Sequence, residues 1–178
     1  MATSYIGQTS LPLALRNNNP GNIRPGDSWL GSQGSNAGFI VFKDLTYGLR
    51  ALAIDLKNKI NKDGLNTISK IVAKYAPPSD NNNDTTYIAT VSKVSGFDAN
   101  APLTADVETI KKLIRGHATV ESGANYQSYI SDADIQTGVD MAFSITGTAK
   151  KVIEDNPGTS AGMLIGIIFV GFFLIKKK

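Results

Sequence analysis

The chain has 178 residues, 42% of them apolar, which suits one folded domain with at most a short appendage. Its formal net charge of +3 is also the charge of its last three residues, Lys176–Lys178, so the rest is neutral and does not favour nucleic-acid binding. It has no cysteine and one histidine, His117, which excludes disulfides, thiolate metal sites and a cysteine nucleophile; we expect no metal and no cofactor.

The first distinctive stretch is Arg16–Arg24, with the sequence Arg-Asn-Asn-Asn-Pro-Gly-Asn-Ile-Arg. Asparagine and glycine tolerate positive φ and proline fixes its own φ, so the stretch predicts an irregular loop. Two interpretations are open: a structural turn, or the polar wall of a binding site. The preceding residues 1–15 lack the basic start and apolar core of a secretory signal, and we expect them to form an N-terminal arm.

One small β element and the longest helix are predicted next. Gly38–Phe42 is short, aromatic and β-branched, which is typical of a strand or hairpin arm. Asp44 is a candidate N-cap, and apolar residues at helical spacing from Leu45 to Ile60 predict a helix that Gly64 ends.

Shorter helices are predicted after this one. They are a helix over Asn66–Ala76 stopped by Pro77, one capped by Asp84 or Thr85 and ended by Gly96, one from near Thr104 towards Glu121, and one begun by a capping box of Ser131 and Asp134. The body, residues 16–147, is therefore expected to be mainly α with a small β element.

The C-terminal residues predict a membrane anchor. Residues 159–175 carry no charge, and the shortest membrane-spanning helices need about 17 residues. Lysines beyond such a segment favour the inner membrane face. We expect a linker at 148–158 and a single transmembrane helix within 159–178 that holds the protein in a lipid membrane. A face of small residues could pair two copies into a homo-oligomer; it consists of Gly158, Gly162 and Gly166.

Glu121 is the candidate catalytic residue. Glutamate occurs at only two other positions, Glu108 early in a predicted helix and Glu154 in the linker. Glu121 lies near the end of an apolar-striped helix, where partial burial would favour its protonated form and let it act as a general acid. The alternative is a carboxylate that caps a turn or pairs with Arg115 or Lys112.

Two resemblances bear on this residue. Residues 121–125, Glu-Ser-Gly-Ala-Asn, resemble the Glu-Ser-Gly-x-Asn signature of lytic transglycosylases in the lysozyme-like superfamily. Residues 16 to about 145 are similar to a group of bacteriophage virion proteins that open with Asn-Asn-Pro-Gly-Asn-Ile-Arg. The matching features are Asn18–Arg24, Trp29, Phe39–Phe42, Tyr47–Ala51, Tyr75–Pro78 and Tyr87.

The resemblance implies a lysozyme-like α+β fold and a virion-associated enzyme that degrades peptidoglycan during host cell-wall penetration. Glu121 would protonate the glycosidic oxygen. A muramidase usually needs a second carboxylate and none stands out, whereas a lytic transglycosylase can use one glutamate as acid and then base. The residues expected to bind sugar are Asn19, Asn22, Arg24, Trp29 and Tyr126.

An alternative function is structural. A catalytically weak or inactive lysozyme-like protein could link the capsid or a vertex to the viral membrane. The partners expected from both functions are a lipid membrane and other virion proteins, with peptidoglycan as the substrate of the enzyme.

Overall fold

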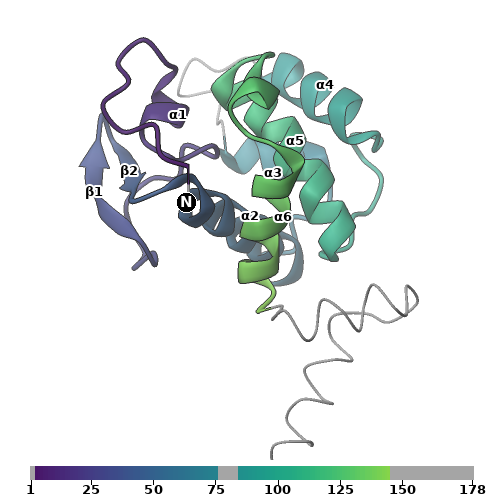
Figure 1. The fold of residues 1–178 in the computed structure, drawn as a ribbon. Coiled ribbons are helices and arrows are strands. Elements are labelled where there is room, and N and C mark those ends of the chain that lie inside the picture. Colours follow the sequence, from purple (N-terminus) through teal and green to yellow (C-terminus); the bar gives the residue numbers. More distant parts are fainter. Residues whose placement is uncertain (1–2, 76–83, 145–178) are drawn as a thin grey trace, which may run out of the picture. The chain divides into compact units, whose positions relative to one another are not determined.

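The computed structural model describes residues 3–75 and 84–144, and the chain divides into two units, Met1–Ala142 and Phe143–Lys178. The described helices and strands lie in the first unit (Figure 1). They are α1 (Leu13–Arg16), β1 (Ser32–Asn36), β2 (Phe39–Phe42), α2 (Leu45–Asn61), α3 (Ile68–Tyr75), α4 (Asp84–Ser95), α5 (Val107–Ser122), η2 (Tyr126–Ser128) and α6 (Asp132–Ala142). In Figure 1 the β-hairpin lies at one edge of this unit and α4 at the opposite edge.

The central helix α2 forms where the sequence predicts it. The Asp44 carboxylate accepts hydrogen bonds from the backbone N–H groups of Thr46 (3.1 Å) and Tyr47 (3.3 Å), which confirms the predicted N-cap. The apolar stripe of α2 is buried in the core and packs most extensively against α6. The approach is close at Gly138 of α6, because a Cβ atom there would lie 3.0 Å from backbone atoms of α2.

Of the two strands of the hairpin, the sequence predicts β2 but not β1. β2 alternates buried Ile40 and Phe42 with more exposed neighbours, as expected for a strand with one face on the core. Its antiparallel partner β1 is polar and exposed throughout, so no apolar pattern could reveal it. Ala37 and Gly38 join the strands. Their φ angles of 51° and 82° are both positive, as a two-residue type I′ hairpin turn requires.

The asparagine loop is mostly a structural element. Asn18 and Asn19 are 0% exposed. The Asn18 amide donates to the carbonyl of Phe42 (3.0 Å), and its oxygen accepts from the backbone N–H of Tyr5 (2.9 Å). The Asn19 amide donates to the carbonyls of Ile23 (3.0 Å) and Ile40 (2.9 Å). These side chains replace backbone partners that an irregular loop lacks, and they attach β2 and the N-terminal arm to it.

Replacing Asn19 with alanine is expected to lower the free energy of unfolding by about 3 kcal/mol, because three hydrogen bonds to buried backbone groups would be lost. Urea unfolding followed by circular dichroism measures this change. The control is Asn100→Ala at an exposed position, where a change within about 0.5 kcal/mol is expected. Equal effects in the two variants would show that the Asn19 side chain does not hold the loop.

The N-terminal arm is part of the first unit. The backbone N–H of Leu45 donates to the carbonyl of Thr3 (2.9 Å), and the Tyr5 hydroxyl donates to the carbonyl of Tyr129. The short helix α1, which the sequence did not predict, spans the expected boundary between arm and domain at residue 16.

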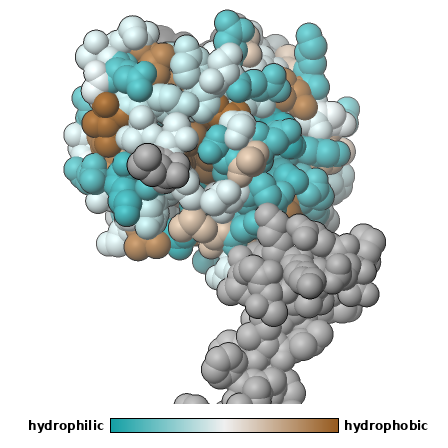
Figure 2. All heavy atoms as spheres, viewed as in Figure 1, coloured by the Kyte–Doolittle hydropathy of each residue, from teal (hydrophilic) through white to brown (hydrophobic). Residues whose placement is uncertain are grey.

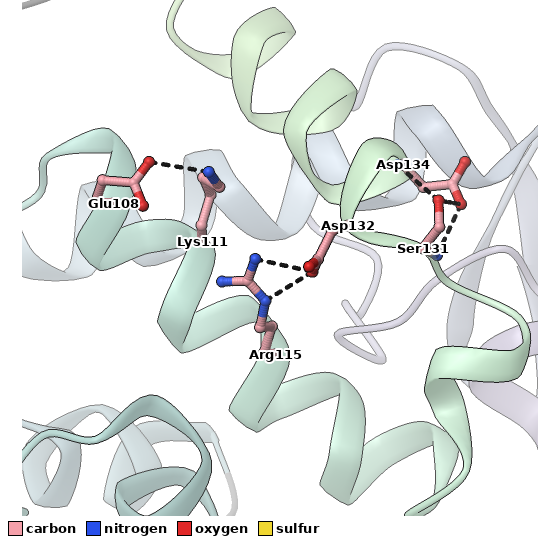
Figure 3. A network of polar contacts seen from close by, with 6 residues as sticks. All are labelled: Glu108, Lys111, Arg115, Ser131, Asp132 and Asp134. Atoms are coloured by element: carbon pink, nitrogen blue, oxygen red, sulfur yellow. Dashed lines mark hydrogen bonds and ion pairs between the residues drawn. The ribbon is translucent and has the colours of Figure 1, made fainter. Parts of the chain in front are cut away.

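The later helices lie near their predicted positions, and their caps agree only in part. Asp84 and Thr85 both lie inside α4, so neither is its N-cap, and Pro77, the expected stop of α3, lies outside the described residues. In α6 the backbone N–H of Asp134 donates to Ser131 Oγ (3.1 Å) and that of Ser131 donates to Asp134 Oδ2 (2.9 Å), which confirms the capping box (Figure 3). Gly96 follows the end of α4 with φ of 76°. Helix α5 begins at Val107, slightly later than the expected start near Thr104. Its N-cap is Asp106, because the Asp106 carboxylate accepts from the backbone N–H of Thr109 (2.9 Å).

The surface of the first unit is mainly polar on the face seen in Figure 2, where hydrophobic residues are scattered among hydrophilic ones. Among the described residues, the large apolar side chains with substantial exposure are Ile6, Leu30 and Val94. Isolated apolar residues of this kind are normal on a protein surface.

The predicted fold class needs one correction. The mainly helical domain with a two-stranded sheet is present, but the transmembrane helix is not supported: in residues 3–75 and 84–144 no helix is both long enough and apolar enough to cross a membrane. The expected linker at 148–158, the anchor at 159–178 and the face of Gly158, Gly162 and Gly166 lie outside the described residues.

Candidate functional site

Glu121 lies in the last turn of α5, one residue before the helix ends at Ser122. The apolar stripe of this helix is fully buried at Ile110, Leu113 and Ile114, and Glu121 is half-buried. Gly123 follows with φ of 90°, which turns the chain away from the helix. The carboxyl group is therefore held by a rigid element at the boundary between core and solvent.

Two neutral side chains donate hydrogen bonds to the carboxyl group of Glu121. Asn22 Nδ2 lies 2.6 Å from Oε2, and the Tyr87 hydroxyl lies 2.8 Å from Oε1. Asn22 comes from the asparagine loop, 99 residues earlier in the chain, and has a left-handed φ of 45°. Tyr87 comes from α4, which packs against α5. The structure thus brings together Glu121 and one of the predicted sugar-binding residues.

His117 is the next residue of this hydrogen-bonded group and contacts Tyr87. Its Nδ1 atom is 2.8 Å from the Tyr87 hydroxyl oxygen, and its side chain is 0% exposed. The Nε2 atom is buried and has no hydrogen-bond partner among the described residues. Burial, and then the positive charge of Lys59, lowers the pKa of His117 from 6.5 to about 3, so the imidazole is neutral at physiological pH. We call Asn22, Tyr87, His117 and Glu121 the Glu121 network.

A second polar group supports the network from α2 and α3. The Tyr75 ring lies 4.9 Å from that of His117, and its hydroxyl donates to the Asp55 carboxylate. Lys59 pairs with Asp55 at 2.6 Å. Burial, and then Asp55, raises the pKa of Tyr75 well above 10.0; burial, and then Glu121, does the same to the pKa of Tyr87. Both phenols therefore keep their protons at neutral pH.

The ion pair proposed as an alternative role for Glu121 does not form. Arg115 binds Asp132 of α6 instead, with Nε 2.9 Å and Nη2 2.8 Å from Oδ1 (Figure 3). The Lys112 ammonium lies 5.1 Å above the Phe97 ring. Because its described partners are the neutral Asn22 and Tyr87, Glu121 keeps a carboxyl group that can exchange a proton without breaking an ion pair.

The other four predicted sugar-binding residues, all in the described part of the chain, make no hydrogen bond to Glu121. Asn19 is buried and bonded to backbone groups, and Tyr126 of η2 is 3% exposed, so both are parts of the core. Arg24 is exposed, with its guanidinium 5.1 Å from the Phe39 ring beside the hairpin. Trp29 is half-exposed in the loop before β1. Of these four residues, only Arg24 and Trp29 offer surface to a ligand.

Sequence reasoning did not assign Tyr87 and His117 to the site. One signal for His117 was present: it precedes Glu121 by four residues, so the two share one face of a helix. Tyr87 was noted only as one of the features shared with the phage virion proteins, and nothing in its sequence position distinguishes it from a core residue of its helix. In the described part of the chain, no cluster of three or more His, Cys, Asp or Glu side chains could hold a metal ion.

Lowering the pH from 7 to 5 is expected to cost about 2 kcal/mol of stability through His117 alone. The unfolded chain binds a proton below pH 6.5, whereas the folded chain does so only near pH 3, so the free energy of unfolding falls as the pH falls through this window. Urea unfolding of wild type and His117→Asn at both pH values isolates the effect, since the variant lacks the titrating group. The same pH dependence in both proteins would contradict it.

No family model matches the chain. It is similar to Protein P5 of Pseudoalteromonas phage PM2, with 33% identity over 135 residues, an alignment that covers 72% of this chain and 81% of the phage protein.

Proposed function

The chain belongs to the same family as Protein P5 of Pseudoalteromonas phage PM2, and we propose that it is a virion-associated enzyme that cleaves glycosidic bonds of peptidoglycan. Glu121 is the general acid of the reaction. The enzyme acts as a lytic transglycosylase, and its role is to open the host cell wall during entry.

The observation that carries this proposal is the environment of Glu121. Its carboxyl group lies at the end of a helix with one buried face and is held by Asn22 (2.6 Å) and Tyr87 (2.8 Å), two neutral donors on separate elements. Fixed orientation without a paired cation is what a group needs if it is to transfer a proton to a glycosidic oxygen. The Glu-Ser-Gly-Ala-Asn sequence at residues 121–125, with its resemblance to lytic transglycosylases, supports the same role.

One carboxyl group suffices for transglycosylation. Glu121 gives its proton to the glycosidic oxygen as the bond from that oxygen to muramic-acid C1 breaks. As a carboxylate it then takes the proton from the C6 hydroxyl of the same sugar while that oxygen bonds to C1. The products are a 1,6-anhydro-muramic end and a free hydroxyl on the leaving sugar, and Glu121 is protonated again.

The test is digestion of purified peptidoglycan sacculi by the full chain, with a known lysozyme as positive control and mass spectrometry of the soluble products. Anhydro-muramic ends are expected. Reducing muramic ends would show hydrolysis and thus a muramidase. No soluble product, under conditions in which the control is active, would overturn the enzymatic proposal. Mass spectrometry of purified virus particles tests the virion assignment separately, since a virion component is present in them.

A further inference from the structure

We propose that Tyr87 and His117 are positioning residues that determine which oxygen of Glu121 carries the transferred proton. This inference rests on the proposed function, because it concerns the same carboxyl group. In the working arrangement His117 Nδ1–H donates to the Tyr87 oxygen, the Tyr87 hydroxyl donates to Glu121 Oε1, and the transferable proton resides on Oε2.

The Tyr87 hydroxyl has one proton and two hydrogen-bond partners. The Tyr87 hydroxyl oxygen lies 2.8 Å from both Glu121 Oε1 and His117 Nδ1, but a hydroxyl has one proton and can donate only once. If it donates to Glu121, then His117 must carry its proton on Nδ1. If it donates to His117, then Glu121 must carry a proton on Oε1 and donate it to the phenol. The tautomer of His117 and the proton position on Glu121 are therefore linked.

Neither Tyr87 nor His117 changes its charge near neutral pH. Burial keeps the imidazole neutral, with a pKa of about 3, and the phenol protonated. The groups that face His117 are Tyr75 of α3 and Tyr87 of α4, with Lys59 of α2 acting by its charge and Asp55 bound to both Tyr75 and Lys59. Since His117 has a single ring proton, only the two tautomers remain.

The two oxygens of Glu121 differ in how well they could deliver a proton to a substrate. A proton on Oε1 would lie between Glu121 and Tyr87, which is only 7% exposed, and would point into the protein. A proton on Oε2 lies beside Asn22, a half-buried residue of the asparagine loop. Oε2 can carry this proton and still accept from Asn22, because an oxygen of this kind has more than one lone pair.

The arrangement with the proton on His117 Nδ1 keeps Glu121 in the same position in both steps of the reaction. Tyr87 donates to Oε1 while Oε2 is protonated, and the same hydrogen bond remains when Glu121 is a carboxylate. The acid and the base forms are then held in one place without rearrangement, which limits the cost of the second step. In the other tautomer Tyr87 donates to His117 and gives the carboxylate no hydrogen bond.

The first experiment does not depend on activity. His117 is the only histidine, so its ring nitrogens can be observed without ambiguity by NMR of the 15N-labelled full chain near pH 7. The Nδ1–H tautomer is expected in the wild type and the Nε2–H tautomer in Tyr87→Phe. A wild-type protein in the Nε2–H form, or a tautomer unchanged by Tyr87→Phe, would overturn the proposal.

The second experiment follows kcat, KM and the pH profile of peptidoglycan cleavage. Tyr87→Phe is expected to lower kcat by roughly 10-fold to 100-fold, to leave KM unchanged and to shift the pH profile. His117→Leu should behave in the same way. His117→Asn should retain most activity, because its amide can place an N–H near the position of Nδ1. An unshifted pH profile in Tyr87→Phe, or equal losses in the two His117 variants, would overturn the positioning role.

The matched control is Tyr75→Phe. It removes the hydroxyl of a neighbouring tyrosine that contacts the His117 ring but bonds to Asp55. In Tyr75→Phe the His117 tautomer and the pH profile should stay as in the wild type. If Tyr75→Phe had the same effects as Tyr87→Phe, the effects would reflect the packing of the tyrosines and not the hydrogen bond from Tyr87 to Glu121. If the wild type cleaves no peptidoglycan, the proposed function fails, while the NMR experiment still decides the Tyr87–His117 arrangement.

Discussion

Replacing Glu121 with glutamine is expected to lower kcat for peptidoglycan cleavage by at least about 100-fold, because the amide has no acidic proton to give. The fold should be unaffected. Glutamine keeps an acceptor for the Tyr87 hydroxyl, and its NH₂ group can donate to Asn22 Oδ1, which has no hydrogen-bond partner among the described residues, once the Asn22 amide rotates. Release of soluble muropeptides measures the first effect, and thermal unfolding measures the second.

The control for this variant is Glu108→Gln. It makes the same change of charge on the same helix, but Glu108 is exposed and forms a surface ion pair with Lys111 one turn later, at 2.9 Å (Figure 3). Such a surface pair contributes at most about 0.5 kcal/mol, so activity and stability should both stay near wild type. Equal activity of Glu121→Gln and Glu108→Gln would remove Glu121 from the mechanism. A loss of activity in Glu121→Gln that accompanies unfolding would assign it a structural role.

Replacing Gly48 with alanine is expected to destabilise the fold by about 4 kcal/mol or more. In an ordinary helix interior, replacing glycine with alanine stabilises the fold by about 1 kcal/mol. The sign of the change in unfolding free energy therefore distinguishes a close contact at Gly48 from an ordinary helix position. Gly48 lies in α2 against the asparagine loop: a Cβ atom there would overlap the carbonyl oxygen of Asn18 and lie 2.9 Å from its carbonyl carbon. These are backbone atoms of a loop that Asn18 and Asn19 fix by buried hydrogen bonds, so the clash cannot be relieved by rotating a side chain.

Urea unfolding followed by circular dichroism measures the effect of Gly48→Ala. The control is Ala89→Gly at an exposed position of α4, which changes helix propensity alone and should cost about 1 kcal/mol. A Gly48→Ala protein at least as stable as the wild type would show that α2 and the loop do not depend on this close contact.

Where local chemistry decides a structure, the sequence was a reliable guide. The start of α2 follows from Asp44, whose carboxylate meets N–H groups only two and three residues away. The start of α6 follows in the same way from Ser131 and Asp134. The buried faces of these helices follow from the spacing of their apolar residues, because side chains three and four residues apart share a helix face.

The structures of strand β1 and the asparagine loop could not be predicted from local sequence. β1 is polar and exposed, and it becomes a strand because β2 offers it backbone partners. The composition of the asparagine loop predicted an irregular backbone. It could not show which asparagines are buried and which lie at the candidate site. Asn19 is buried and bonded to the backbone of β2, whereas Asn22, three residues later, reaches Glu121. That difference depends on what packs around the loop.

By itself the sequence determined the helical domain, its main caps, and Glu121 as the one glutamate at the end of an apolar helix. Only the tertiary structure decided what Glu121 touches. Its hydrogen-bond partners are 99 and 34 residues away, on a loop and on another helix, and helix packing brings them within 2.8 Å. Contacts between such distant residues leave no periodic pattern in the chain, because each depends on the path of every element between them.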